Sequence, residues 1–87
     1  MKSQVELIGK KIRTIRETMG LSRPKFAELL DIPPTTLKNY ELGYREVGGA
    51  FLVAFGHNAK LHPFTLWLVS DKTAPEIGQI SPDDYQE

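Results

Sequence analysis

Residues Ser22–Arg45, SRPKFAELLDIPPTTLKNYELGYR, decide the fold of this chain. Ser22 is a preferred helix cap, and the apolar residues that follow at helical spacing predict a short helix over residues 23–30. The prolines at 33–34 interrupt this pattern, because the residue before a proline is disfavoured in the helical conformation. The second proline can itself start a helix, which we expect over residues 34–42. The stretch therefore predicts two short helices joined by a turn of three or four residues.

Apolar residues at helical spacing predict further helices on both sides of this stretch. The first helix is expected over residues 4–19, with Gly20 as its left-handed stop. Its apolar stripe consists of Val5, Ile8, Ile12, Ile15 and Met19. Residues 50–55 predict a fourth helix, and a last one is expected over residues 63–69, where Pro63 occupies the first position. The predicted fold class is all-α, a bundle of five short helices.

The length and composition fit one small globular domain. Of the 87 residues, 40% are hydrophobic and 25% are charged, and a chain of this length seldom builds two cores. We assign residues 1–70 to the folded domain and residues 71–87 to an acidic, proline-containing tail that we expect to be ordered only in part. Cysteine is absent, so neither a disulfide scaffold nor a thiolate metal site is expected.

Charge is distributed unevenly along the chain, although the formal net charge is zero. Residues 1–47 carry nine Lys or Arg against six Asp or Glu, which gives a net charge of +3. Residues 48–87 carry two against five, which gives −3. One half of the molecule can therefore meet a polyanion such as a nucleic acid while the other half faces solvent or a partner.

Several classes of site are disfavoured by the residues present. His57 and His62 would lie about 140° apart on a helix, and no cysteine or nearby carboxylate pair completes a metal shell, so no metal is expected. No nucleophile elbow or phosphate-binding glycine motif occurs, and we expect neither an enzyme nor a cofactor. The most apolar stretch, residues 47–56, is about half the length that spans a bilayer. The amino-terminal end has no signal-peptide apolar region, so we expect a cytoplasmic protein with no membrane partner.

Two short helices joined by a tight turn, second and third in an all-helical domain, are the arrangement of a helix-turn-helix DNA reader. The sequence resembles the phage repressor and Cro-like helix-turn-helix family, also called XRE or Cro/C1-type, over roughly residues 8–69. The resemblance rests on Ile12-Arg13, Ile15-Arg16, Gly20-Leu21-Ser22, Phe26-Ala27, Ile32, Thr36-Leu37 and the run from Tyr40 to Arg45. It implies a lambda-repressor-like bundle of five helices, often dimeric, that binds operator DNA with its third helix in the major groove.

Two departures from the family pattern fall in the turn. Asp31 stands where the family usually has Gly, and a left-handed backbone there costs Asp roughly 1 kcal/mol relative to Gly. Pro33 and Pro34 stand where the family often has a Ser or Thr cap and a polar residue that can bond a base edge. Because proline carries no donor, we expect base reading to shift to later positions.

The third helix presents the residues that we expect to read bases: Pro34, Thr35, Lys38 and Asn39. Asn39 can pair with adenine through two hydrogen bonds, Lys38 can donate to guanine or to a phosphate, and the Thr35 methyl can meet a thymine methyl. The alternative is that these side chains are merely solvated. That alternative is weakest for Asn39, because asparagine is a poor helix former.

Residues that flank the two short helices are expected to hold DNA phosphates. Ser22 and Arg23 can do so through a helix cap, amino-terminal amides and a positive side chain. Arg45, just past the third helix, is expected to be a second phosphate contact, with Lys25 and Tyr44 as weaker ones. A plain helix cap is the alternative role for Ser22, and a solvated surface residue is the alternative for Arg45.

The resemblance also implies two structural roles. Arg16 and Glu41 are expected to form an internal ion pair that ties the first helix to the end of the third. The dimer contact of the family often lies around the last helix, which makes Trp67, Leu68 and Val69 candidates. The alternative for these three residues is ordinary core.

Together these observations predict a sequence-specific regulator of transcription, a bacterial or phage repressor that binds double-stranded DNA. As a homodimer it would recognise an inverted repeat with half-sites about one helical turn apart. A second interpretation is an antitoxin-like interaction module that engages a protein partner through the acidic tail and also regulates its own promoter. A neighbouring toxin-like gene would favour the second interpretation, and a divergent promoter with an inverted repeat would favour the first.

Overall fold

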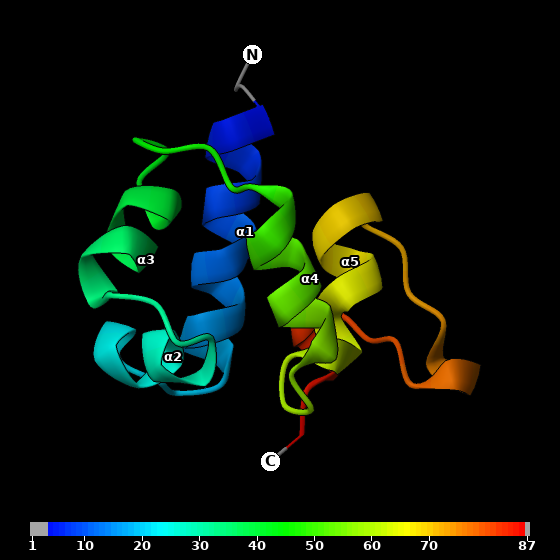
Figure 1. Cartoon of the computed structure of the whole chain (residues 1–87). Helices are drawn as coiled ribbons and strands as arrows, with labels where there is room; N and C mark the ends of the chain where they lie inside the picture. Colours follow the sequence, from blue (N-terminus) through cyan, green and yellow to red (C-terminus); the bar gives the residue numbers. More distant parts are fainter. Residues whose placement is uncertain (1–3, 87) are drawn as a thin grey trace.

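The computed structural model describes residues 4–86 and, within them, the side chains of residues 7–86 (Figure 1). Its helices are α1 (Gln4–Thr18), α2 (Arg23–Leu29), α3 (Pro34–Glu41), α4 (Gly49–His57) and α5 (Thr65–Ser70), with 3-10 helices η1 (His62–Phe64), η2 (Pro75–Ile77) and η3 (Pro82–Asp84). Extended pairing within the described residues is limited to an isolated bridge between Ala74 and Gln79. The all-α fold class is confirmed. None of the described helices is long and apolar enough to cross a membrane.

Local signals set the boundary between α1 and α2. Gly20 has a left-handed φ of 71°, and the Leu21 N–H donates to the carbonyl oxygen of Arg16 at 3.1 Å. Ser22 has an extended backbone, and its Oγ accepts a hydrogen bond from the Lys25 N–H at 3.3 Å. The chain therefore ends one helix and caps the next within four residues.

The turn between α2 and α3 contains a left-handed residue at Asp31, whose φ is 53°. The next residue, Ile32, donates its N–H to the carbonyl oxygen of Ala27 at 3.1 Å, so the turn folds back over the end of α2. Pro33 then has an extended backbone, and α3 begins at Pro34. This closed turn fixes the orientation of α3 relative to α2.

The core consists of apolar side chains from all five α-helices and the adjoining turns. The buried members are Ile12, Ile15, Phe26, Ala27, Leu30, Leu37, Tyr40, Phe51, Phe55, Leu61, Phe64 and Leu68. Ile8 and Met19 pack against this cluster, whereas the side chain of Val5 lies outside the described part of the chain. In Figure 1, α2 and α3 lie on one side of α1, and α4 and α5 lie on the other. The long first helix therefore supports both halves of the bundle.

The closest approach between helices is that of α1 to α3. A Cβ atom placed on Gly9 would overlap the carbonyl oxygen of Tyr40, which is backbone and cannot move aside cheaply. Glycine in the interior of a helix is unfavourable by itself, so its presence here is explained by this contact. Gly9 thereby seats α3 directly on α1.

The last two helices differ from their expected boundaries. α4 continues past residue 55 to His57, and its last amides are followed by Asn58, whose N–H donates to the carbonyl of Ala54 at 3.1 Å. The helix expected over residues 63–69 is divided, because Pro63 lies in the 3-10 turn η1 and α5 begins two residues later. Pro63 lacks an N–H and therefore suits the first turn of η1.

The segment after α5 is more ordered than we expected, and Gln79 is the main reason. This side chain is 7% exposed. Its Oε1 accepts a hydrogen bond from the Leu66 N–H at 3.0 Å, and its Nε2 donates to the carbonyl of His62 at 3.1 Å. One buried amide therefore satisfies backbone groups at the start of α5 that the helix itself leaves unpaired.

Two further contacts hold this segment against the bundle. The Ile80 N–H donates to the carbonyl of Pro63 at 2.9 Å, and the Tyr85 ring lies 5.7 Å from that of Phe64, centroid to centroid. These contacts keep the polar chain between η2 and η3 close to α5, although it contains few apolar residues.

Candidate nucleic-acid interface

The outward face of α3 carries the residues expected to read bases. The residues on its inner side are almost fully buried: Leu37, Tyr40 and Glu41. The residues on its outer side are exposed or partly exposed: Pro34, Thr35, Lys38 and Asn39. Positions three and four apart share one side of a helix. The structure therefore places these four residues on one continuous stripe.

The polar groups of this stripe are not used to hold the fold. Among the described residues, side-chain hydrogen bonds from α3 are confined to Glu41, on the inner face. Lys38 and Asn39 thus present their donors and acceptors outward. Leu42 follows Lys38 and Asn39 at helical spacing and is 37% exposed, so it extends the stripe beyond the end of α3. The sequence analysis missed Leu42, although its spacing could have pointed to it.

The start of α2 forms one flank of this stripe. Ser22 is exposed and caps α2 through its side chain, as described above. Lys25 is also exposed, and its Nζ lies 4.0 Å from the carboxylate of Glu28. Because both of these side chains are more than 70% exposed, that pair contributes little to stability and leaves Lys25 available.

The loop after α3 forms the other flank. The carbonyl oxygen of Asn39 accepts hydrogen bonds from the Tyr44 N–H at 2.9 Å and the Arg45 N–H at 3.3 Å. The Arg45 guanidinium lies 5.7 Å from the centroid of the Tyr40 ring, a cation–π distance. Tyr44 is 77% exposed. The loop therefore returns to the end of α3 and holds an exposed cation there.

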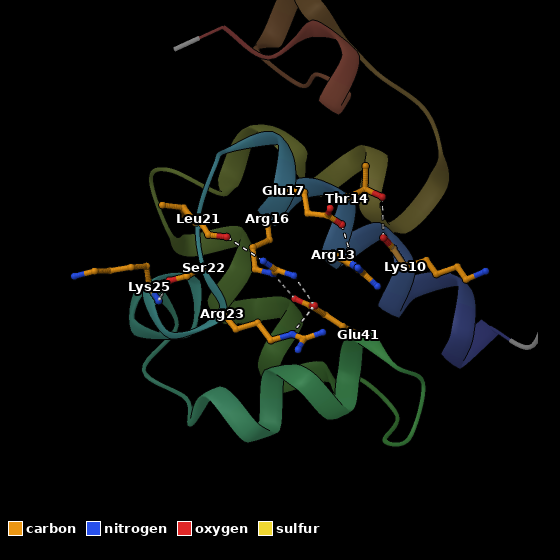
Figure 2. Close-up of polar contacts among 10 residues, drawn as sticks. All are labelled: Lys10, Arg13, Thr14, Arg16, Glu17, Leu21, Ser22, Arg23, Lys25 and Glu41. Atoms are coloured by element: carbon orange, nitrogen blue, oxygen red, sulfur yellow. Dashed lines mark hydrogen bonds and ion pairs between the residues drawn. The ribbon is translucent and has the colours of Figure 1, made fainter.

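Arg16 and Glu41 meet between α1 and α3, as Figure 2 shows. Arg16 Nε lies 2.7 Å from Glu41 Oε2, and Arg16 NH2 lies 3.0 Å from Glu41 Oε1. The same guanidinium donates through NH1 to the carbonyl of Leu21 at 3.0 Å. The Glu41 side chain is fully buried, and its hydrogen bond raises the pKa of Arg16 despite partial burial of the guanidinium. This pair therefore ties α1, the turn after it and α3 together.

Arg23 joins the same cluster, which the sequence analysis did not foresee. Its Nε donates to Glu41 Oε1 at 3.0 Å, and its side chain remains 30% exposed. Two guanidinium groups thus converge on one carboxylate, which leaves one positive charge uncompensated at the start of α2 (Figure 2). No spacing in the sequence reveals this contact, because Arg23 and Glu41 lie on different helices 18 residues apart.

The three residues considered for a dimer contact occupy different environments. Leu68 is 3% exposed and belongs to the core. Trp67 is partly buried and lies 5.1 Å from Lys11 Nζ, measured to the ring centroid. Val69 is 55% exposed. Of the three, Val69 has the most surface to offer to another chain.

His57 and His62 are not brought together as metal ligands. His62 Nδ1 lies 2.8 Å from the carbonyl oxygen of Gly56, a local contact within the turn after α4. Across residues 4–86, the His, Asp and Glu side chains form no group of three that could hold a metal ion.

Comparison with known proteins agrees with this geometry. Residues 12–55, from the middle of α1 to α4, match the helix-turn-helix family. Over 75 residues the chain is 33% identical to the Repressor protein C of Escherichia phage P2, and the match covers 86% of this chain and 76% of that protein. The chain therefore belongs to the helix-turn-helix family of DNA-binding transcription regulators, in the phage repressor or XRE group.

Proposed function

We propose that this protein is a transcriptional repressor that recognises a specific double-stranded DNA sequence by placing α3 in the major groove. The observation that carries the proposal is the stripe on the outer face of α3, whose polar ends make no contact that holds the fold. The major groove admits an α-helix and displays a different pattern of donors and acceptors for each base pair. The similarity to a phage protein named as a repressor supports the sign of regulation.

The stripe offers a small set of base contacts. Asn39 can bond adenine through both its amide groups, and Lys38 can donate to the O6 and N7 atoms of guanine. Thr35, nearer the start of α3, offers a hydroxyl and a methyl group. Each good contact of this kind discriminates against a wrong base by about 1–3 kcal/mol.

Positive and capping groups on both flanks provide phosphate contacts. At the start of α2 these are the exposed Ser22, Lys25 and the unbonded part of Arg23. After α3 they are Tyr44 and Arg45. Contacts to phosphates fix the register of a protein on DNA without reading sequence. The two flanks would thus hold α3 in place over the base edges.

A homodimer follows from this role, because two copies can read an inverted repeat. Val69 and Leu7, 55% and 40% exposed, line an apolar groove of about 410 Å³ that also contains Leu52. We place the contact between copies at this groove, where α1 and α5 meet. Replacing Val69→Glu should convert a sedimenting dimer into a monomer with an unchanged thermal midpoint. A dimer that survives this substitution would move the contact elsewhere.

The function is tested by affinity selection of the purified protein against a random duplex DNA pool. An enriched sequence, arranged as an inverted repeat, is the expected result. Binding to the enriched duplex should weaken steeply with salt, and Arg45→Ala should reduce that dependence by about one released ion. Lys72→Ala removes an exposed cation in the segment after α5 and should leave the slope unchanged. If no sequence is enriched, the helix-turn-helix is a scaffold, and an antitoxin-like module becomes the better explanation.

A further inference from the structure

The first residues of the α3 stripe are unusually poor in hydrogen-bond donors. Pro33 and Pro34 are both exposed, and neither has an N–H group. The Pro33 carbonyl accepts hydrogen bonds from the Thr36 N–H at 3.0 Å and the Leu37 N–H at 3.2 Å. A helix normally leaves four N–H groups unpaired at its start. Within the described chain, the Thr35 N–H is the one such donor that remains without an acceptor at this point of α3.

The stripe therefore has two chemically different parts. Its first part consists of two proline rings and the side chain of Thr35, all exposed. Its second part, one turn later, consists of Lys38 and Asn39, which can form hydrogen bonds. An anion has nothing to bind at the first part, because a phosphate needs N–H groups or a positive side chain. The first part is suited to an apolar group.

The floor of the major groove displays one such group. Every base pair presents hydrogen-bonding atoms there, but thymine also presents the methyl group on its C5 atom. A proline ring laid against a guanine or cytosine edge would bury polar atoms without a partner, which is unfavourable. A ring laid against a pyrimidine methyl buries apolar surface on both sides.

We propose that Pro33 and Pro34 are specificity-determining residues that select pyrimidines carrying a 5-methyl group at the base pairs beneath the start of α3. The inference rests on the proposed function, because it requires α3 to lie in the major groove. Thymine and 5-methylcytosine share the chemistry that the rings recognise. Lys38 and Asn39 then read the neighbouring base pairs by hydrogen bonds, so apolar and polar recognition follow one another along the same helix.

The test uses the full chain and the duplex that selection from the random pool enriches, with thymine replaced by uracil at one position at a time. Uracil lacks the methyl group and keeps every hydrogen-bonding atom of thymine. The expected result is a loss of about fourfold in affinity at one or two positions per half-site, since burying one CH₂ group is worth about 0.8 kcal/mol. A 5-methylcytosine–guanine pair at those positions should bind more tightly than the unmethylated cytosine pair.

Variants locate the effect on the protein. Pro34→Ala keeps a good helix former at the start of α3, and its fold is verified by circular dichroism. It should reduce the ratio of thymine to uracil affinity towards one. Lys38→Ala, one turn further along, should weaken binding to both duplexes and leave that ratio unchanged.

Three outcomes are distinguishable. If the thymine duplex is enriched but uracil binds equally well at every position, the inference is overturned while the proposed function stands. If the ratio persists in a folded Pro34→Ala and in Pro33→Ala, other residues recognise the methyl group and the assignment to the prolines fails. If no sequence is enriched at all, the proposed function and this inference fall together. The uracil comparison with the unaltered protein does not depend on any variant folding.

Discussion

Arg23 at the start of α2 and Glu41 at the end of α3 are joined by a hydrogen bond of 3.0 Å between Arg23 Nε and Glu41 Oε1. The same carboxylate is held by Arg16 from α1, so three helices meet at one buried acid. Arg23 thereby has two roles in this account. Its Nε fixes the spacing between α2 and α3, and the exposed part of its guanidinium faces the phosphates that we place along α2.

The two arginines of this cluster should respond differently to substitution. Arg16→Ala removes the more buried partner of Glu41 and should lower the free energy of unfolding by about 2 kcal/mol, because a fully buried carboxylate keeps only Arg23. Arg23→Ala leaves the Arg16 pair intact and should cost less stability. Its main effect should be weaker binding to all DNA sequences and a salt slope reduced by about one. Urea unfolding and salt titrations separate these effects. An unchanged stability of Arg16→Ala together with weaker DNA binding would reverse the two roles.

Gly9 provides a test of the packing of α1 against α3. Helix propensity alone predicts that Gly9→Ala stabilises the protein by about 1 kcal/mol. The structure predicts the opposite, because the new Cβ would overlap the Tyr40 carbonyl oxygen. We expect a net loss of about 2 kcal/mol, the cost of overpacking, measured by urea unfolding. Gly49→Ala, in the first turn of α4 with open space around the new Cβ, is the matched control and should not be destabilised in this way. A stabilised Gly9→Ala would refute the close approach of the two helices.

Asp31 offers a gain in stability. Its φ of 53° lies in the left-handed region, where a side chain is strained and glycine is not. Asp31→Gly should therefore raise the free energy of unfolding by up to about 1 kcal/mol, visible as a higher thermal midpoint. Asp31→Ala should lower it, since alanine lacks the local hydrogen bonds that let Asp tolerate this conformation. Equal midpoints for all three proteins would show that the turn is not left-handed in solution.

Gln79 is predicted to anchor the segment after α5. Gln79→Ala would leave the Leu66 N–H and the His62 carbonyl without their side-chain partner, which should cost about 1–3 kcal/mol. Glu76→Ala, an exposed position in the same segment, should leave the thermal midpoint unchanged. If Gln79→Ala were as stable as Glu76→Ala, residues 71–86 would contribute nothing to the fold.

The parts of the fold that depend on neighbouring residues were predictable from the sequence. Ser22 and Gly20 mark helix boundaries through local backbone and capping preferences, and the structure has them in those roles. The left-handed residue at Asp31 was expected from its position in the turn. The outer stripe of α3 follows from helical spacing alone, since Leu37 and Tyr40 define the opposite, buried side.

What could not be predicted depends on residues far apart in the chain. The contact of Arg23 with Glu41 exists because α2 and α3 pack at a particular angle, which no local pattern encodes. The order of residues 71–86 rests on Gln79, and a polar residue in a polar segment gives no sign that it will be buried. Gly9 is an intermediate case. A glycine inside a helix pattern indicates a close approach but does not say which helix approaches.

The central claim is that α3 reads base sequence, and it is tested most directly by repeating the selection from a random duplex pool with Asn39→Ala beside the unaltered protein. The account predicts the same half-site for both proteins, except for one base position at which the variant has lost its preference. Arg45→Ala, the control, should select the unaltered half-site with uniformly weaker binding. If Asn39→Ala also selected the unaltered half-site and only bound it more weakly, Asn39 would not read a base, and recognition by the outer face of α3 would be contradicted.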